Sequence, residues 1–167
     1  MIGKIIIGKS YRKCINYCLG NKPGQNEPRA KILESNFVNG SKKEIIDQFE
    51  ELGKMNPRLS NNVMHITLSW PQRDILDANK LKAIADECGL KFGFNKNQSI
   101  VIQHNDTKHQ HIHLVVNRVG FDGKTLSDSN NYKKMADFCR DIERKYNITK
   151  VLSPKRFQPK ELRELPR

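Results

Sequence analysis

The sequence contains no long hydrophobic run. Its longest apolar runs have three residues, as in Ile5–Ile7 and Leu114–Val116. A helix that spans a bilayer needs about 20 mostly apolar residues, and the N-terminus shows no apolar segment typical of a secretion signal. We therefore expect a cytoplasmic protein without membrane insertion.

Cysteine is scarce, and its spacing is not that of a metal site. The four cysteines form no CxxC pair; they are Cys14, Cys18, Cys88 and Cys139. They fall on mostly apolar faces of predicted helices. We interpret them as reduced thiols in a protein core, because this spacing argues against a four-cysteine zinc site.

Acidic residues are few compared with basic ones. The chain has 18 Asp and Glu against 30 Lys and Arg, which gives a net charge of +12. Such an excess in one domain suggests a polyanionic partner, of which nucleic acid is the leading candidate. The basic residues are spread out, with a dense run from Lys155 to Arg167. No strongly basic amphipathic helix supports the competing partner, an anionic membrane surface.

The hydrophobic pattern predicts strands and helices that alternate along the chain. We expect helices at about 10–19, 41–52, 77–89 and 129–146, and strands at 2–8, 30–37, 63–70, 99–104 and around 109–116. The last two strands are joined by a turn-like segment, 105–108, which indicates antiparallel pairing. The predicted fold is α/β (α+β): a central, mostly antiparallel five-stranded sheet with helices packed on it.

Histidines are concentrated in one segment. Four of the five lie within ten positions, at His104, His109, His111 and His113. Residues i and i+2 of a strand share a face, so His111 and His113 project together. If the turn pairs His104 with His109, all four histidines share that face, and His104 and His111 are diagonal neighbours about 7–8 Å apart.

Clustered imidazoles of this kind suggest a metal site. Three neutral histidines are common ligands of divalent transition metals and leave positions open for water or substrate. The alternative is a surface histidine cluster or a pH-sensitive patch. Nitrogen ligands favour manganese, zinc or nickel in vitro, whereas cellular supply can impose magnesium.

The first predicted helix carries two tyrosines on different faces. Tyr11, Ile15 and Cys18 follow the spacing of a buried face, and Tyr17 lies about 200° around the helix from Ile15. We expect Tyr11 in the core and Tyr17 free to face a site. An exposed tyrosine without a catalytic role is the ordinary alternative, because a phenol with a pKa near 10 needs help to attack at neutral pH.

Several motifs together resemble a known family. They are Ile15–Leu19, His65–Ser69, Asp122–Lys124, Glu143–Tyr146 and, most specifically, the pattern H-x-D-x-x-H-x-H-x-H-x-x-x-N-R from His104 to Arg118. Over roughly residues 1–150 the chain resembles the N-terminal relaxase domain of plasmid and integrative-element mobilization proteins, which belong to the histidine-hydrophobe-histidine endonucleases. Residues 151–167 are then a basic tail, or a linker to a C-terminal region that this sequence lacks.

The resemblance implies a relaxase-like fold and a DNA strand-transfer reaction. In that family a tyrosine of the first helix attacks a DNA phosphate at a nick site, leaving a 5′-phosphotyrosine and a free 3′-hydroxyl. Carried over by position, the nucleophile is Tyr17, and His104, His111 and His113 hold a divalent metal, magnesium or manganese. To reach the histidines, the first strand is expected at the sheet centre beside the histidine hairpin.

The implied partners are single-stranded or supercoiled DNA at a transfer origin, together with accessory mobilization proteins and a coupling protein. Five further residues are candidates for supporting a ligand or contacting the substrate: His109, Asp106, His65, Arg118 and Asn117. Each has an ordinary alternative. Asp106 either orients a ligand histidine or serves the turn, His65 either approaches the site or is a hydrogen-bonded core histidine, and Arg118 either contacts phosphate or is a solvated strand charge.

Two other functions stay open at this point. One is a rolling-circle replication initiator or transposase of the same nuclease class, in which the tyrosine usually follows the histidine pair, whereas here it precedes it. The other is a non-catalytic DNA-binding module that a structural metal stabilises, with His109 as a fourth ligand.

Overall fold

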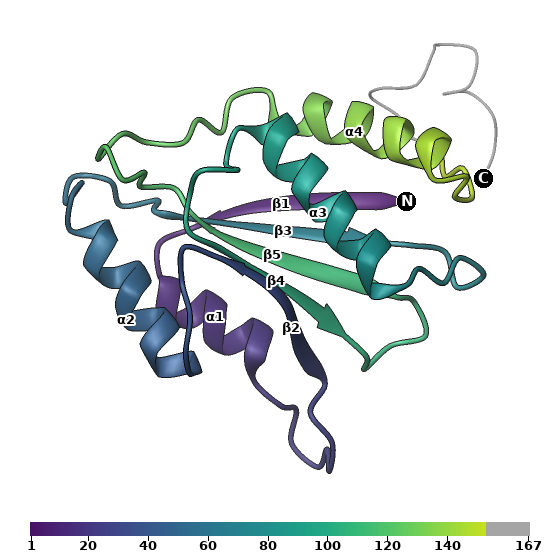
Figure 1. Cartoon of the computed structure of the whole chain (residues 1–167), viewed down its shortest axis with the longest axis horizontal. Helices are drawn as coiled ribbons and strands as arrows, with labels where there is room; N and C mark the ends of the chain where they lie inside the picture. The colour runs from purple at the N-terminus through teal and green to yellow at the C-terminus, as the bar shows by residue number, and fades with distance from the viewer. Residues whose placement is uncertain (153–167) are drawn as a thin grey trace.

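The computed structural model describes residues 1–152, in which a five-stranded sheet carries four helices (Figure 1). The dense basic run that begins at Lys155 lies outside the described residues. All neighbouring strands run antiparallel, so the predicted sheet type is confirmed. The elements are β1 (Ile2–Gly8), α1 (Tyr11–Leu19), β2 (Ala30–Asn36), α2 (Lys42–Gly53), β3 (Val63–Ser69), α3 (Ala78–Phe92), β4 (Ser99–His104), β5 (His111–Asn117) and α4 (Asn131–Lys145).

The strand order is β1-β3-β5-β4-β2, which places β5 at the centre and β1 at an edge. The expectation that β1 lies beside the β4–β5 hairpin is therefore wrong, because β3 separates them. The burial of the strands explains the order. β3 is buried at Met64, Ile66 and Leu68, whereas Ile2 and Ile6 of β1 are 61% and 46% exposed, as suits an edge strand.

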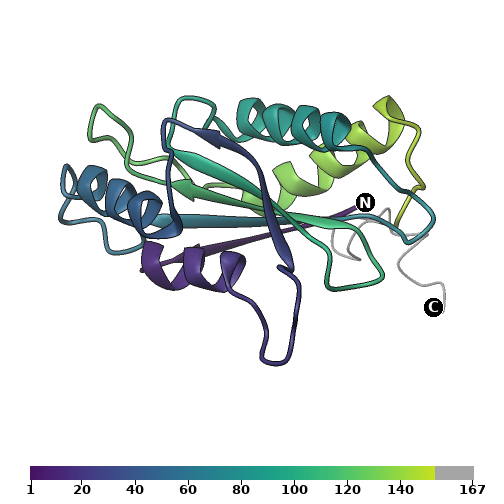
Figure 2. The ribbon, with the colours of Figure 1, turned by 60° about the horizontal axis from the view of Figure 1, so that its bottom comes forward.

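Helices cover both faces of the sheet (Figure 2). α3 and α4 pack on one face, and α1 with α2 packs on the other, each over its own apolar cluster. Successive side chains of β5 point to opposite faces of the sheet, so this strand contributes to both apolar clusters. Ile112, Leu114 and Val116 join the α3–α4 cluster, and Val115 joins the α1–α2 cluster, so His111 and His113 face the α1 side.

The helix boundaries follow local capping signals. Ser41 and Glu44 form a complete capping box at α2, and Asp77 caps α3. α3 continues to Phe92 rather than ending at Gly89, and the left-handed Gly93 ends it. Gly89 is a buried residue inside this helix. Within residues 1–152, no helix has the length and apolar character that crossing a bilayer requires.

The histidine hairpin pairs two residues later than the sequence suggested. His104 lies opposite His111, and Ile102 lies opposite His113. The connection therefore spans 105–110 and includes His109. Because the error is an even number of residues, it does not change the face of any strand residue. The prediction that His104, His111 and His113 share one face is confirmed. The prediction that His109 shares it is wrong.

Tyr11 lies in the core, as predicted. Its side chain is 4% exposed, and its hydroxyl donates to Oδ1 of Asn117 at 2.7 Å. Burial raises the pKa of Tyr11 to about 12, so the phenol stays protonated. Asn117 in turn donates to the carbonyl of Phe49 and to Gln98, and so ties α1 and α2 to the sheet.

Substituting Tyr11→Phe removes this buried hydrogen bond without creating an orphan acceptor, because Asn117 Oδ1 also accepts from the Val119 amide at 3.0 Å. We expect a loss of about 1 kcal/mol in the free energy of unfolding, measured by urea denaturation. Tyr17→Phe is the matched control, because Tyr17 is 60% exposed. Equal stability of the two variants would contradict the structural role of Tyr11.

Candidate active site

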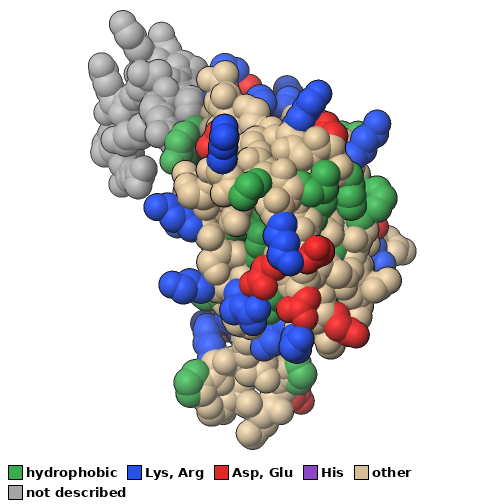
Figure 3. All heavy atoms as spheres, turned by 90° about the vertical axis from the view of Figure 1, so that its left-hand side faces the viewer, with side chains coloured by type: hydrophobic (Ala, Val, Ile, Leu, Met, Phe, Trp, Pro, Cys, Tyr) green, Lys and Arg blue, Asp and Glu red, His purple; other side chains and the backbone are tan. Residues whose placement is uncertain are grey.

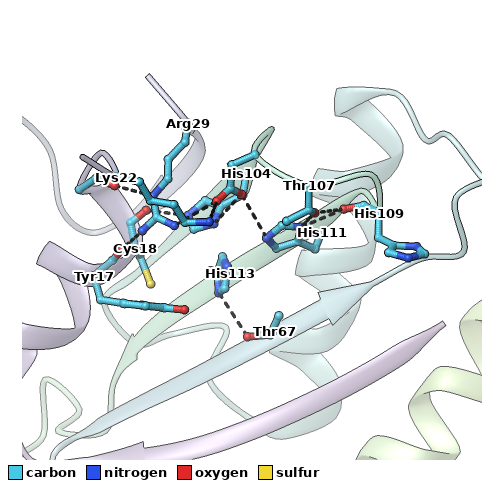
Figure 4. Close-up of polar contacts among 12 residues, drawn as sticks. Tyr17, Cys18, Lys22, Arg29, Thr67, His104, Thr107, His109, His111 and His113 are labelled. Atoms are coloured by element: carbon cyan, nitrogen blue, oxygen red, sulfur yellow. Dashed lines mark hydrogen bonds and ion pairs between the residues drawn. The ribbon is translucent and has the colours of Figure 1, made fainter. Parts of the chain in front are cut away.

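Three imidazoles meet on the α1 side of the sheet. His104 comes from the end of β4, and His111 and His113 come from β5; one ring nitrogen of each lies within 4.8 Å of the others. Figure 4 shows the three rings grouped together. The ring centres of His104 and His113 are 4.1 Å apart. The pairing of His104 with His111 and the alternation of β5 produce this arrangement.

Backbone carbonyls fix the proton positions of two of the rings. Nε2 of His104 donates to the carbonyl of Cys18 at 2.7 Å, and Nδ1 of His111 donates to the carbonyl of His109 at 3.0 Å. A carbonyl only accepts, so the nitrogen that faces it carries the proton. A neutral ring then leaves Nδ1 of His104 and Nε2 of His111 as the unprotonated atoms.

The third ring is held from β3. Nδ1 of His113 lies 2.8 Å from Nε2 of His65 and 3.2 Å from the hydroxyl of Thr67. These contacts leave Nε2 of His113 for a ligand. His65 does approach the site, through this contact, and so supports the orientation of His113.

The buried histidines are neutral at physiological pH. Burial lowers the pKa of His113 to about 3 and that of His65 to about 4. Burial also lowers the pKa of His104. Neutral imidazole is the form that binds metal, so these rings need not lose a proton first.

Asp106 places a carboxylate beside the cluster. Its Oδ1 atom is buried without a hydrogen-bond partner and lies 3.9 Å from both Nδ1 of His104 and Nε2 of His111. Its other oxygen pairs with Lys22 at 2.6 Å and Arg29 at 3.4 Å, and the Lys22 hydrogen bond lowers the pKa of Asp106 to about 2. The carboxylate bonds to neither ring, so carbonyls rather than Asp106 orient these ligands. An unpartnered carboxylate oxygen near unprotonated ring nitrogens fits a divalent cation.

Tyr17 lies next to the cluster. Its side chain is 60% exposed, which confirms that it lies off the buried face of α1. Its ring centre is 6.3 Å from that of His113 and 6.1 Å from that of His65, both edge-on. Figure 4 shows the side chain extending from α1 toward His113.

Arg29 is a site residue that the sequence analysis missed. It is buried in the loop between α1 and β2, and its guanidinium donates to the carbonyls of Tyr17 and Gly20. The same group lies 5.6 Å from the centre of the Tyr17 ring and pairs with Asp106. Arg29 thus ties the end of α1 to the histidine hairpin. A single arginine in an irregular loop forms no periodic pattern, so no sequence signal marked it.

Three candidates lie apart from the cluster. His109 is exposed in the connection, and its ring points away (Figure 4). Asn117 and Arg118 follow at the far end of β5 and are buried. Arg118 donates to the carbonyls of Asn61 and Leu126, and Asn117 bonds to Tyr11. Their hydrogen bonds hold the fold together, so neither is placed to contact a substrate at the histidines.

The cluster and Tyr17 line an open groove of about 1030 Å³ that continues across β3 to β1. Five basic residues line it, Lys4, Lys9, Lys13, Lys22 and Arg29, against one acidic residue, Asp106. By contrast, the face in Figure 3 shows acidic side chains among the basic ones and no histidine. The groove therefore combines positive charge with the histidine cluster.

The structure brings together an antiparallel sheet, two histidines one residue apart on its central strand and a tyrosine of the first helix, as the resemblance to relaxases implies. The family profile described as "Relaxase: MobA/VirD2-like, nuclease domain" matches residues 17–148. The chain belongs to this family.

Comparisons with individual proteins agree. The chain is 29% identical over 90 residues to a Protein TraI of Escherichia coli, covering 53% of this chain and 12% of that protein. A second Protein TraI of Escherichia coli is 25% identical over 119 residues, covering 70% of this chain and 16% of that protein. The chain thus spans less than a fifth of either relative.

A solved structure, reported as "Molecular Basis of Vancomycin Resistance Transfer in Staphylococcus aureus", aligns with a TM-score of 0.54 and 11% identity. The alignment covers 92% of this chain and 97% of that chain. At this identity the likeness shows the fold alone, and it agrees with the five-stranded antiparallel sheet.

The role of Arg29 can be tested by Arg29→Lys, which keeps the charge and removes the forked donor. At least one helix-end carbonyl then loses a charged hydrogen bond. We expect the free energy of unfolding to fall by about 1–3 kcal/mol, measured by urea denaturation. Arg12→Lys is the control, because Arg12 pairs with Glu50 at the exposed surface, and this change should alter stability by less than about 0.5 kcal/mol. Equal effects in both variants would contradict an anchoring role.

Proposed function

We propose that this domain is a DNA relaxase that nicks one strand at a transfer origin of a plasmid or mobile element and so starts conjugative mobilization. The observation that carries the proposal is the position of Tyr17. An exposed phenol lies beside three clustered histidines, in a groove whose charged lining residues are mostly basic. Family membership supports a nuclease, and this juxtaposition supports the chemistry.

A divalent cation, magnesium or manganese, would be held by Nδ1 of His104 and Nε2 of His111 and His113. Asp106 adds negative charge next to the first two of these atoms. When bound, such an ion polarises a phosphate and stabilises the charge that develops on its oxygens. Three imidazoles leave room for a phosphate oxygen, as a catalytic site requires.

Tyr17 supplies the nucleophile. Its phenolic oxygen forms a bond to phosphorus while the bond from phosphorus to the 3′-oxygen breaks, and the bonding electrons leave with that oxygen. The phenol proton passes to solvent, and the departing oxygen takes one up as a 3′-hydroxyl. The product is a 5′-phosphotyrosine. One phosphate ester replaces another, so the free 3′-hydroxyl can reverse the reaction without an energy source.

The groove supports a single DNA strand as the substrate. Lysine side chains along it neutralise phosphates, and the exposed Ile2 and Ile6 of β1 offer apolar surface to unpaired bases. Supercoiled DNA supplies such a strand where a duplex opens. Accessory mobilization proteins and a coupling protein are the further partners we propose. Residues 1–150 would form the relaxase unit, and 151–167 a basic tail or a linker.

Metal binding is tested by His111→Ala against His109→Ala. His111 belongs to the cluster and His109 points away from it, so the pair is matched in chemistry and differs in position. Outer partners of a ligand alone contribute about 10–100-fold to metal affinity. We therefore expect His111→Ala to lose at least about 100-fold in Mn²⁺ affinity, and His109→Ala to change little.

Isothermal titration calorimetry with Mn²⁺ measures both, and circular dichroism checks that each variant is folded. Unchanged Mn²⁺ affinity in His111→Ala, or equal losses in the two variants, would overturn the assignment of the ligands.

Covalent chemistry is tested by Tyr17→Phe against Tyr11→Phe. Tyr17→Phe lacks the attacking oxygen, so we expect normal binding of Mn²⁺ and DNA but no covalent adduct. Tyr11→Phe should keep most of the adduct, because its hydroxyl is buried against Asn117. The measurement is a denaturant-stable gel shift with a labelled oligonucleotide that spans the nick site. If the adduct forms in Tyr17→Phe and is lost in Tyr11→Phe, the assignment of Tyr17 as the nucleophile is wrong.

A further inference from the structure

A second group of ligating atoms lies beside the histidine cluster. The sulfurs of Cys14 and Cys18 and a ring nitrogen of His65 all lie within 4.8 Å of one another. The two cysteines are four residues apart on α1, so they share one side of the helix. His65 reaches them from β3, on the sheet face that α1 covers.

The spacing within this group suits a tetrahedral metal. Sγ of Cys18 lies 3.5 Å from Nε2 of His65. With zinc–sulfur bonds of about 2.3 Å and zinc–nitrogen bonds of about 2.0–2.1 Å, tetrahedral ligands of these two kinds stand about 3.5 Å apart. Two thiols and one imidazole form a softer donor set than the three imidazoles next to it, and such a set selects zinc over magnesium or manganese.

We propose that Cys14, Cys18 and His65 form a second metal site, specific for a thiophilic cation such as Zn²⁺ and separate from the histidine cluster. The site is accessible, since Cys14 and His65 line the groove, whereas Cys18 is fully buried. Neither cysteine takes part in the strand-transfer reaction. Three protein ligands leave a fourth position for water.

The other two cysteines lack this environment. Cys88 and Cys139 are buried in the cluster under α3 and α4, on the opposite face of the sheet. Among the described residues, no potential metal-binding group includes either of them. They therefore provide matched controls for the thiols of α1.

The two sites are coupled through His65. Its Nε2 atom, 3.5 Å from the Cys18 sulfur, is also the atom that meets Nδ1 of His113 at 2.8 Å. Binding of Nε2 to zinc would end the contact with His113 and would place a second cation beside the cluster. Zinc at the thiol site therefore weakens metal binding at the histidines and inhibits the enzyme. This consequence rests on the proposed function, whereas the thiol site itself does not.

Cobalt(II) tests the site directly, because a thiolate bound to Co²⁺ gives an intense near-ultraviolet charge-transfer absorption that nitrogen and oxygen ligands do not give. The whole chain, kept reduced, is titrated with Co²⁺, and Zn²⁺ is then added. We expect the thiolate absorption to reach its maximum when one Co²⁺ ion occupies the thiol site of each chain. It should disappear when zinc displaces cobalt.

Variants show which side chains bind the cobalt that gives this absorption. Cys14→Ala and Cys18→Ala should lose it, and Cys139→Ala should retain it. His111→Ala should also retain it while losing Mn²⁺ affinity, so failure of the proposed relaxase site and failure of the thiol site give different results. No thiolate absorption in the folded wild-type protein, or its persistence in Cys14→Ala, would overturn the proposal.

Inhibition is measured as the Zn²⁺ concentration that halves adduct formation in excess Mn²⁺. Loss of an outer contact of a ligand changes metal affinity by about 10–100-fold. We therefore expect Cys14→Ala to need at least about tenfold more zinc than Cys139→Ala. Equal zinc sensitivity in these two variants would refute the coupling.

Discussion

The pairing of β4 with β5 is the constraint on which the site depends. Both strands are internal to the sheet, and β5 is buried on both faces, so side chains from two helical layers hold their register. This register sets His104 opposite His111, and His113 lies two residues further along β5 on the same face. The imidazoles are grouped because the apolar residues that alternate with them in β5, Ile112 and Leu114, are fixed in the core under α3 and α4.

A second set of contacts joins α1 to this hairpin. The carbonyl of Cys18 accepts from His104, and Arg29 connects the carbonyl of Tyr17 with Asp106. The helix that carries Tyr17 therefore ends on the residues that form the histidine cluster. This arrangement aligns tyrosine and histidines although more than eighty residues separate them in the sequence, and although β1 lies at the edge of the sheet.

The features that local periodicity governs were predictable from the sequence. Alternation in a strand gave the shared face of His111 and His113, and helical spacing distinguished buried Tyr11 from exposed Tyr17. Features that depend on long-range packing were not. The connection after His104 is two residues longer than its turn-like composition indicated, and the helix end expected at Gly89 is absent because α3 continues to Phe92.

Charge–charge contacts across the fold were also beyond the sequence. Arg29 and Asp106 are 77 positions apart and meet only because the loop after α1 folds back onto the hairpin. Asp106 has the composition of an ordinary turn residue, and only the folded chain shows that one of its oxygens is buried beside two ring nitrogens. The order of strands likewise reflects which strand is buried on both faces rather than any local motif.

The alternation of β5 also limits how such a domain can diversify. A single-residue insertion or deletion within the strand would send every later side chain to the opposite layer, exchanging imidazoles for core residues. Changes of length are tolerated only where the backbone is not paired, as in the segment between α1 and β2 that borders the groove. Variation in length is thus expected in that loop, while the strand that carries His111 and His113 keeps its length.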